Sequence, residues 1–328
     1  MLPSSVEHIW HLNQQELQEF LDSKTLANRQ IRFYAPSFTY YRSSLFCSSQ
    51  KDFPTISITG AGCALNCKHC GGKVLATMQQ AVTPEKLFTL CSQLKQDGAV
   101  GCLISGGCLP DGSVPLKPFT QTIARVKKTL GLTVFVHTGI IDLESAVLLK
   151  QSGVDAALID VIGSQETIDK VYGLKVTVQD YADSLFALQN SGLPFVPHVI
   201  VGLNEGKLDG ELAALQMISQ TKPSAVVIIA FMPIAGTDMA KVAPPKPHDI
   251  ARVAASARVL FPEVAVVLGC MRPKGRIRGV TDVLALKAGV DAVAFPSQVA
   301  IDFVQKQGWA ISFSPYCCAK IYVDYPKR

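Results

Sequence analysis

From about Phe53 onward, short apolar runs rich in β-branched residues alternate with longer segments in which apolar positions recur at helical spacing. Eight runs are apolar nearly throughout, as is typical of a parallel sheet that is covered on both faces. Strands are therefore predicted at Pro54–Thr59, Val100–Ser105, Thr133–His137, Ala156–Val161, Val196–Val201, Ala225–Phe231, Val264–Gly269 and Asp291–Phe295. Helices are predicted at Pro84–Gln96, Leu116–Leu130, Leu143–Gln151, Gln179–Asn190, Glu211–Thr221, Pro247–Leu260, Val280–Ala288 and Ser297–Gln307.

This alternation predicts an α/β fold. Eight strand–helix units in about 245 residues match a full or nearly full (β/α)₈ barrel of the TIM type, and a doubly wound sheet is the alternative. In such a barrel the chemistry is built at the carboxyl ends of the strands. Residues that directly follow each predicted strand are therefore the first candidates for a functional site.

We expect three parts along the chain: an N-terminal extension over residues 1–52, the barrel over residues 53–309 and a C-terminal tail over residues 310–328. The extension contains one predicted helix, Asn13–Leu26, and an aromatic-rich segment, Phe33–Tyr41, expected to pack across a barrel face. The run Ala310–Tyr316, if extended, spans ~23 Å and returns the chain to the barrel mouth.

Composition excludes several classes of protein. Hydrophobic residues make up 48% of the chain and charged residues only 17%, which excludes a disordered or fibrous protein. The net charge of +5 comes without any long Lys/Arg block, so nucleic acid is not an expected partner. The first residues lack the pattern of a signal peptide, and no apolar run approaches the ~18 residues of a membrane span. We therefore expect a soluble, cytoplasmic protein with no membrane partner.

The 10 cysteines indicate metal or redox chemistry rather than a disulfide scaffold. Three of them, Cys63, Cys67 and Cys70, lie in a glycine-flanked loop directly after the first predicted strand. This spacing allows three thiolates to hold one cubane cluster while its fourth iron stays open. Zinc is disfavoured, because a closed zinc site needs a fourth ligand and His69 is too close to its neighbours in sequence to serve.

The loop GAGCALNCKHCGG resembles the CxxxCxxC signature of the radical S-adenosylmethionine (SAM) superfamily. The resemblance implies a [4Fe–4S] cluster whose open iron chelates SAM. It also implies reductive cleavage of SAM to a 5′-deoxyadenosyl radical, which removes hydrogen from an unactivated carbon. His69 stands where the superfamily usually has an aromatic residue, and it is expected near the adenine.

Other positions agree with this resemblance and are expected to bind the cofactor. Gly106 and Gly107, followed by Cys108, occupy the place of the GGE motif, where bare backbone approaches the methionine amino group. His137 and Asp160 end the third and fourth strands and are expected to bond the ribose or methionine portion, unless they are buried, satisfied polar residues. The adenine-contacting segment and the P-x-x-GT turn of biotin synthase relatives are matched by Ile200, Gly202, Met232 and Pro233.

The seven other cysteines divide by position. Cys91 and Cys102 are expected in the core. We predict an auxiliary iron–sulfur cluster held by a further set, with buried, unliganded thiols as the alternative. The expected ligands of that cluster are Cys47, Cys317 and Cys318, with Cys270 or Cys108 as the fourth.

A basic segment also follows the seventh predicted strand. Arg272 is the one candidate for a direct role, by pairing with a carboxylate of the substrate or cofactor. Lys274, Arg276 and Arg278 are expected either to dock an acidic partner or to form a solvated basic loop.

Over nearly its whole length the sequence resembles a group of proteins long labelled biotin synthase homologues, through FYAPSFTYY, LISGGC, DVIG, LGCMRP and the terminal CC. One branch of this group consists of subunits of a two-component lipoyl synthase. That resemblance implies sulfur insertion at C6 or C8 of an octanoyl chain, with the auxiliary cluster as sulfur donor.

The implied partners are an octanoylated lipoyl carrier domain or H-protein-like substrate, a second radical SAM subunit, and an electron donor such as ferredoxin or flavodoxin. Two other hypotheses stay open. One is a biotin-synthase-like or carbon-skeleton reaction on a small molecule. The other is a non-enzymatic iron–sulfur carrier.

Overall fold

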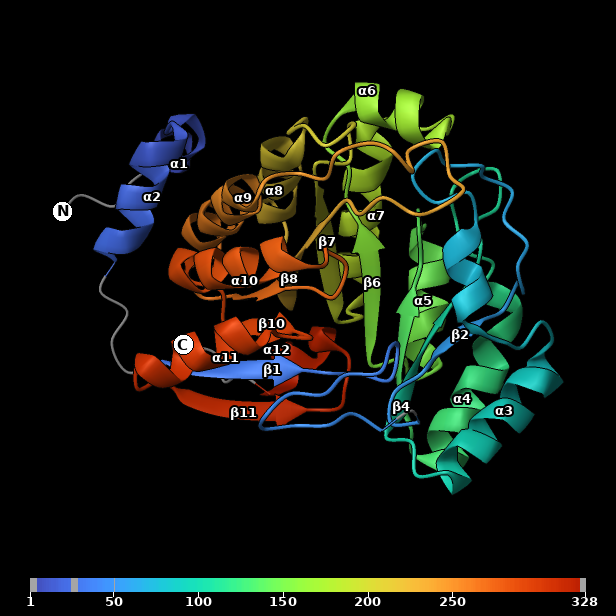
Figure 1. Ribbon diagram of the computed structural model, residues 1–328. Coiled ribbons are helices and arrows are strands. Elements are labelled where there is room, and N and C mark those ends of the chain that lie inside the picture. The colour runs from blue at the N-terminus through green and yellow to red at the C-terminus, as the bar shows by residue number, and fades with distance from the viewer. Residues whose placement is uncertain (1–4, 25–28, 50, 325–328) are drawn as a thin grey trace.

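The computed structural model describes residues 5–24, 29–49 and 51–324. Its centre is a curved 11-stranded sheet in which neighbouring strands run parallel, with helices packed around the outside (Figure 1). The strand order is β11-β1-β10-β9-β8-β7-β6-β5-β4-β2-β3. The predicted α/β barrel architecture is confirmed.

All eight predicted barrel strands are present. They are β2 (Thr55–Ser57), β4 (Gly101–Ser105), β5 (Thr133–His137), β6 (Ala156–Asp160), β7 (Phe195–Val201), β8 (Ala225–Ala230), β9 (Ala265–Leu268) and β10 (Ala292–Ala294). These strands are neighbours in the order in which they occur along the chain. That excludes the doubly wound alternative, in which the strand order reverses at a switch point.

The predicted helices between the strands are also present. They are α3 (Pro84–Gln96), α4 (Thr120–Leu130), α5 (Leu143–Gln151), α7 (Val178–Ser191), α8 (Glu211–Ser219), α9 (Pro247–Leu260), α10 (Arg276–Ala288) and α11 (Gln298–Lys306). Thr83 caps α3 by accepting a hydrogen bond from the backbone N–H of Lys86. None of the helices in the described residues has the length and apolar character needed to span a membrane.

The barrel is not closed by direct pairing of its first and last strands. β2 pairs with β4 and with the short strand β3 (Gln79–Gln80), whereas β10 pairs with β1 (Gln30–Tyr34). β1 in turn pairs with β11 (Ala310–Ser314). Both terminal parts of the chain therefore contribute a strand to the sheet, beside β10.

The expectation that Phe33–Tyr41 packs across a barrel face is wrong for its first residues. Phe33 and Tyr34 belong to β1 and are completely buried. The ring of Phe33 lies 5.2 Å from that of Phe313 on β11, so pairing of the two strands also buries their aromatic rings. Only the residues after β1 lie over the rim, where the hydroxyl of Tyr41 donates to the carbonyl of Pro296.

Two short helices precede β1. They are α1 (Val6–His11) and α2 (Gln14–Ser23). Asn13 begins α2 with a capping box that it shares with Glu16, as its sequence position predicts. The predicted helix extended to Leu26, but α2 ends at Ser23, and residues 25 and 26 lie outside the described part of the chain.

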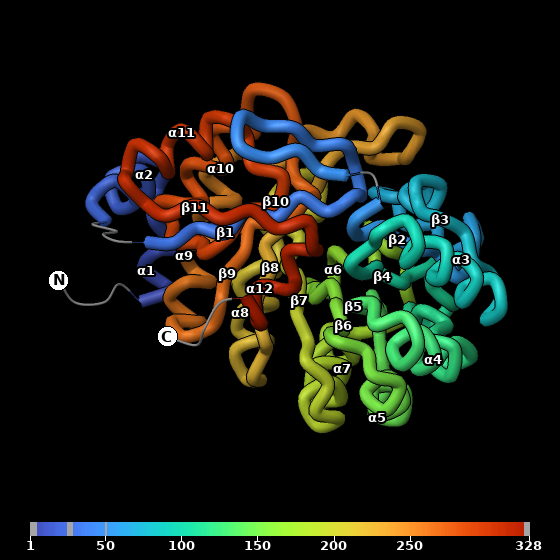
Figure 2. Tube along the Cα trace, turned by 90° about the horizontal axis from the view of Figure 1, so that it is seen from below, coloured from blue at the N-terminus to red at the C-terminus, as the bar shows by residue number. Residues whose placement is uncertain are grey.

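The C-terminal segment enters the barrel from its mouth. β11 runs parallel to β1, so it ends at the same edge of the sheet as the barrel strands. The chain then turns inward through a 3₁₀ turn (Cys318–Lys320) and α12 (Ile321–Asp324), which lies near the centre of the ring of strands in Figure 2. The hydroxyl of Tyr322 donates to the carbonyl of Asp155, directly before β6. The tail therefore reaches the floor of the barrel, where Asp324 pairs with Arg32 at 3.0 Å.

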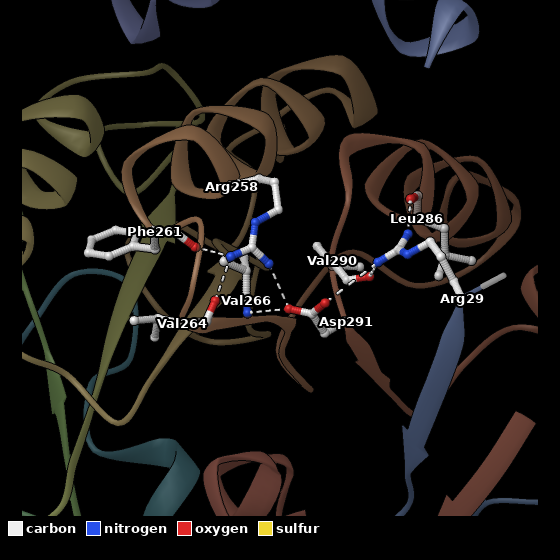
Figure 3. A network of polar contacts seen from close by, with 8 residues as sticks. All are labelled: Arg29, Arg258, Phe261, Val264, Val266, Leu286, Val290 and Asp291. Carbon is white, nitrogen blue, oxygen red and sulfur yellow. Dashed lines mark hydrogen bonds and ion pairs between the residues drawn. The ribbon is translucent and has the colours of Figure 1, made fainter. Parts of the chain in front are cut away.

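A buried ionic network fixes β1 to the base of the barrel (Figure 3). Asp291, directly before β10, is 1% exposed and lies between Arg258 and Arg29. Its carboxylate accepts from Arg258 at 2.7 Å and from the backbone N–H of Val266 at 2.9 Å, and one Arg29 nitrogen lies 3.7 Å away. The remaining guanidinium donors bond carbonyls of neighbouring loops and helices, including those of Phe261 and Leu286. One carboxylate thus joins β9, β10, α9 and the start of β1.

Replacing Asp291 with Asn should destabilise the protein by about 3–5 kcal/mol, because it leaves two buried guanidinium groups without their shared counter-charge. The matched control is Asp22→Asn, which breaks a half-exposed surface pair with Lys287 and should cost less than about 1 kcal/mol. Denaturant-induced unfolding at one pH measures both changes. Equal losses for the two variants would contradict a structural role for the network.

Candidate active site

The loop that follows β2 carries Cys63, Cys67 and Cys70, which we call the loop cysteines. All three are free thiols, and Cys67 is the most buried, at 9% exposure. The loop is held by backbone hydrogen bonds at both ends: Ala64 N–H donates to the carbonyl of Cys108, and Lys68 N–H to that of Val171. Burial and the neighbouring thiols raise the pKa of Cys67 to about 12.

The glycine turn after β4 lies directly against this loop. A Cβ on Gly107 would lie 2.1 Å from the carbonyl oxygen of Gly62 and 2.6 Å from Cα of Cys63, so no larger residue fits without moving the loop. Thr59 joins the two segments, because its hydroxyl accepts from the Gly107 N–H at 2.7 Å and donates to the Gly62 carbonyl at 2.8 Å. Gly107 is thus required by the packing of the loop itself.

The loop cysteines open onto a cavity of about 270 Å³ at the carboxyl ends of β2 and β4–β8, here called the first cavity. Its wall includes most of the residues that the sequence assigned to cofactor binding. These are His69, Gly106, Gly107, Cys108, His137, Asp160, Ile200 and Met232. Sequence positions far apart in the chain therefore meet around one space.

Two titratable residues of this wall form an ion pair. His137 Nε2 and an Asp160 oxygen lie 3.5 Å apart, with side chains 25% and 32% exposed. Burial alone lowers the pKa of His137, but the attraction and hydrogen bond to Asp160 outweigh it, and the pKa is raised. Burial raises the pKa of Asp160, but attraction to His137, His198 and His69 lowers it, with a net decrease. The pair thus places a carboxylate and an imidazole that favours its protonated form at the cavity wall.

The family model of the radical SAM superfamily matches residues 57–213, which span β2, the cysteine loop and the strands to β7. Residues 57–213 are a radical SAM domain. Curated biotin synthases are similar to the chain. That of Prochlorococcus marinus is 25% identical over 303 residues, 89% of this chain and 84% of the relative. That of Neorickettsia sennetsu is 27% identical over 226 residues, 66% of this chain and 68% of the relative.

Solved structures share the fold of this protein. The FeFe-hydrogenase maturase HydG from Carboxydothermus hydrogenoformans superposes with a TM-score of 0.62, covering 94% of this chain and 75% of the maturase at 13% identity. Methylornithine synthase gives a TM-score of 0.58, covering 94% of this chain and 97% of its own, at 14% identity. At such identities these matches support the architecture alone.

The radical SAM family implies SAM and a [4Fe–4S] cluster, and the residues of the first cavity fit both. The donor set is three free thiols from one short loop. The described residues contain no group of three or more His, Cys, Asp or Glu side chains already gathered as for a metal ion. Beside the thiols, the buried Nδ1 atom of His69 has no hydrogen-bond partner. Burial lowers the pKa of this imidazole to about 4, so the ring is neutral and available to a polar ligand.

A second cavity of about 680 Å³ adjoins the first around the mouth of the radical SAM barrel. Cys270, Cys317 and Cys318 line it, and we call them the cavity cysteines. Cys317 and Cys318 are each 4% exposed, and the hydrogen bond between their thiols lowers the pKa of Cys317 and raises that of Cys318. The two cavities share part of their walls. The shared residues include Ser105, His137, Asp160, Ile229, Met232 and Met271.

Several predicted site residues lie elsewhere. Cys47 is exposed and lines neither cavity, although its thiol lies 3.7 Å from the hydroxyl of Tyr40, which does. Cys108 lines the first cavity and not the second, so it stays apart from the cavity cysteines. Pro233 and Gly202 line neither cavity, while their neighbours do. Cys91 and Cys102 are fully buried, as predicted.

The expected direct role of Arg272 is wrong. Its side chain is completely buried and donates to Asp282 at 2.8 Å, to the carbonyl of Gly269 at 2.5 Å and to that of Phe295 at 3.3 Å. Every arm of the guanidinium is thus occupied within the protein. Arg272 fixes the β9–α10 and β10–α11 connections instead of binding a ligand.

Sequence reasoning missed residues that support the site. Glu211, at the start of α8, is 4% exposed and accepts from the N–H groups of Gly202 at 2.7 Å and Asp209 at 2.6 Å, so it holds the loop after β7. Burial raises the pKa of Glu211 to about 7. Tyr172 and Tyr181 line the first cavity, and Tyr172 meets His69 edge-on at 5.1 Å between ring centres. The short π-helix that positions Tyr172, Ile168–Tyr172, has no evident periodicity in the sequence.

Gly107→Ala should separate the glycine turn from the cysteine loop, because the new methyl group meets backbone atoms. We expect the protein without SAM to lose at least the ~1–3 kcal/mol typical of overpacking, and to retain less iron after anaerobic reconstitution. Gly106→Ala is the matched control, since its methyl group would meet only the side chains of Thr59 and Ile58, at 3.0 Å or more. Thermal unfolding and iron analysis compare the two. A Gly107→Ala protein as stable and iron-rich as the control would contradict this role.

Proposed function

We propose that this protein is one subunit of a two-component lipoyl synthase. In this proposal it inserts sulfur at C6 or C8 of an octanoyl chain attached to a lipoyl carrier domain or H-protein-like substrate. The observation that carries the proposal is that the loop cysteines and the cavity cysteines open onto two cavities with a common wall. Sulfur insertion at an unactivated carbon needs a radical source and a sulfur donor within contact distance of the same chain.

The residues of the chain divide the work of such a site. When bound, the [4Fe–4S] cluster and SAM supply a 5′-deoxyadenosyl radical. The loop cysteines would hold that cluster, and the cavity cysteines would hold an auxiliary cluster that donates sulfur. Apolar wall residues shared by both cavities, Ile229, Met232 and Met271, exclude water from the space between them. His137 and Asp160 offer a polar contact on the same wall.

An acylated, acidic carrier is the proposed macromolecular partner. Exposed apolar residues gather on α10, α11 and the rim segment near the second cavity: Val280 is 50% exposed, Val299 57% and Leu45 48%. Gly279 lies against Val299, and Ser44 bonds Gln298, which brings these three elements together. The basic residues Lys274 and Arg276 precede or begin α10 and are exposed. The second radical SAM subunit and a ferredoxin or flavodoxin as electron donor follow from the sequence resemblance.

A second candidate is a biotin-synthase-like sulfur insertion into a small molecule, which the similarity to curated biotin synthases favours. This reaction would use the same loop cysteines and cavity cysteines, and it differs only in the molecule that contains the reacting carbon. The test of the main proposal must therefore include both kinds of substrate.

The reconstituted protein, given SAM and strong reductant under anaerobic conditions, should form 5′-deoxyadenosine. With the partner subunit it should thiolate an octanoyl-lysine peptide and leave a free small acid unchanged. Liquid chromatography with mass spectrometry measures both products. Absence of 5′-deoxyadenosine would exclude both enzymatic proposals, and thiolation of the small acid alone would favour the second.

Cysteine variants divide this reaction into its two parts. Cys63→Ala should abolish both products. Cys318→Ala should abolish thiolation and keep 5′-deoxyadenosine formation within roughly a factor of two, because the radical source is separate from the sulfur donor. Cys47→Ala is the matched control, since its thiol lies outside both cavities, and it should thiolate normally. A Cys318→Ala protein that still thiolates would contradict the assignment of the sulfur donor.

A further inference from the structure

The second cavity contains an arginine with two buried nitrogens that lack a hydrogen-bond partner. Arg278, in the first turn of α10, lines the cavity together with Cys270 and Tyr41. Its Nε and one terminal nitrogen are buried and make no hydrogen bond. A buried charged donor without an acceptor costs more free energy than a typical hydrogen bond contributes to stability. Proteins therefore rarely retain such a donor unless a ligand satisfies it.

Among the described residues, no nearby acidic side chain accepts a hydrogen bond from the two buried nitrogens of Arg278. Asp282 is the closest in sequence, but one of its oxygens accepts from Arg272 at 2.8 Å and the other from the N–H of Ser297 at 2.8 Å. Asp160, the only acidic residue of the cavity wall, pairs with His137. Burial and the adjacent Arg272 lower the pKa of Arg278 to about 10, which leaves the guanidinium charged at neutral pH. Asp282 attracts the guanidinium, but no described residue accepts a hydrogen bond from its two buried nitrogens.

Two further features make this corner of the cavity positive. Lys274 lines the same cavity and is exposed, and no ion pair involving it is present among the described residues. The amino end of α10 lies at this corner, since Lys274 and Arg278 both line the cavity. Gly275 provides no side-chain cap, and the first turn has no acidic residue. The helix dipole therefore adds to the potential of the cationic side chains. Apolar side chains also line this cavity, among them Leu158, Val227 and Phe295.

We propose that Arg278, assisted by Lys274, binds a carboxylate group of a molecule whose aliphatic chain lies against the apolar side chains of the second cavity. A carboxylate matches the planar guanidinium fork and accepts from both unpaired nitrogens at once. The identification of the bound molecule as the substrate rests on the proposed function. The carboxylate has two conceivable sources, the end of a free medium-chain acid or an acidic side chain beside the acylated lysine of a carrier.

The first test measures binding to the reconstituted full-length protein by isothermal titration calorimetry, with one pair of probes for each source. One pair is octanoate and octanamide. The other is an octanoyl-lysine peptide with a neighbouring Asp and the same peptide with Asn. We expect at least ~10-fold tighter binding of the carboxylate member in one pair, because a charge-assisted bond to a buried guanidinium is lost in the neutral member. The pair that discriminates identifies the source.

Variants assign this discrimination to Arg278. Arg278→Gln should bind both members of the discriminating pair equally, and Arg278→Lys should retain part of the preference. Lys306→Gln is the control, because Lys306 is an exposed cation on the neighbouring helix α11 and lines neither cavity. Equal binding within both pairs by the wild-type protein, or a preference that survives in Arg278→Gln, would overturn the proposal.

Thermal unfolding distinguishes ligand binding from a structural role. If Arg278 is kept for a ligand, ligand-free Arg278→Gln should be at least as stable as the wild-type protein, since the change removes an unpaired buried charge. A clear loss of stability would show that the arginine is structural and would overturn the proposal. Formation of 5′-deoxyadenosine, measured on the same samples, tests the proposed function separately, because carboxylate binding does not require the radical reaction.

Discussion

The arrangement of the site depends on the pairing of β1 with β10 on one side and β11 on the other. Both pairings are parallel, so the C-terminal strand must end at the same edge of the sheet as the barrel strands. Cys317 and Cys318 follow within a few residues and are therefore placed at the barrel mouth, where they line the second cavity. The buried Asp291 network holds the start of β1 at the other end. The position of Cys317 and Cys318 among the cavity cysteines thus depends on β1, a strand outside the radical SAM domain.

The C-terminal tail also shapes the interior of the barrel. Because it descends from Cys318 to Tyr322 inside the ring of strands, it fills space that would otherwise open the floor to solvent. The two cavities are consequently confined to the mouth, where they meet at His137 and Asp160. Apolar side chains line both cavities. The first also contains the loop cysteines, glycine backbone and His69, and the second contains the cavity cysteines with the cations Lys274 and Arg278. The two cations suit the second cavity to a chain with an anionic group.

The sequence predicted the barrel strands well because strands covered on both faces must be apolar throughout. It missed β1, whose residues Gln30 and Arg32 interrupt the pattern, because pairing with two neighbours, and not periodicity, makes that segment a strand. Positions after strands correctly indicated which side chains surround the first cavity. They did not indicate the direction of each side chain. Arg272 bonds Asp282, ten residues later on α10, and Cys47 is exposed and lines neither cavity. Such orientations depend on tertiary partners that spacing alone does not specify.

We propose that the loop cysteines and the cavity cysteines hold two separate clusters at the mouth of one barrel. Iron and acid-labile sulfide per chain, after anaerobic reconstitution of the wild-type protein and of a Cys63→Ala/Cys67→Ala/Cys70→Ala variant, test it most directly. We expect ~8 irons for the wild type and ~4 for the variant, since the cavity cysteines would retain their own cluster. Values of ~4 irons for the wild type and none for the variant would contradict it.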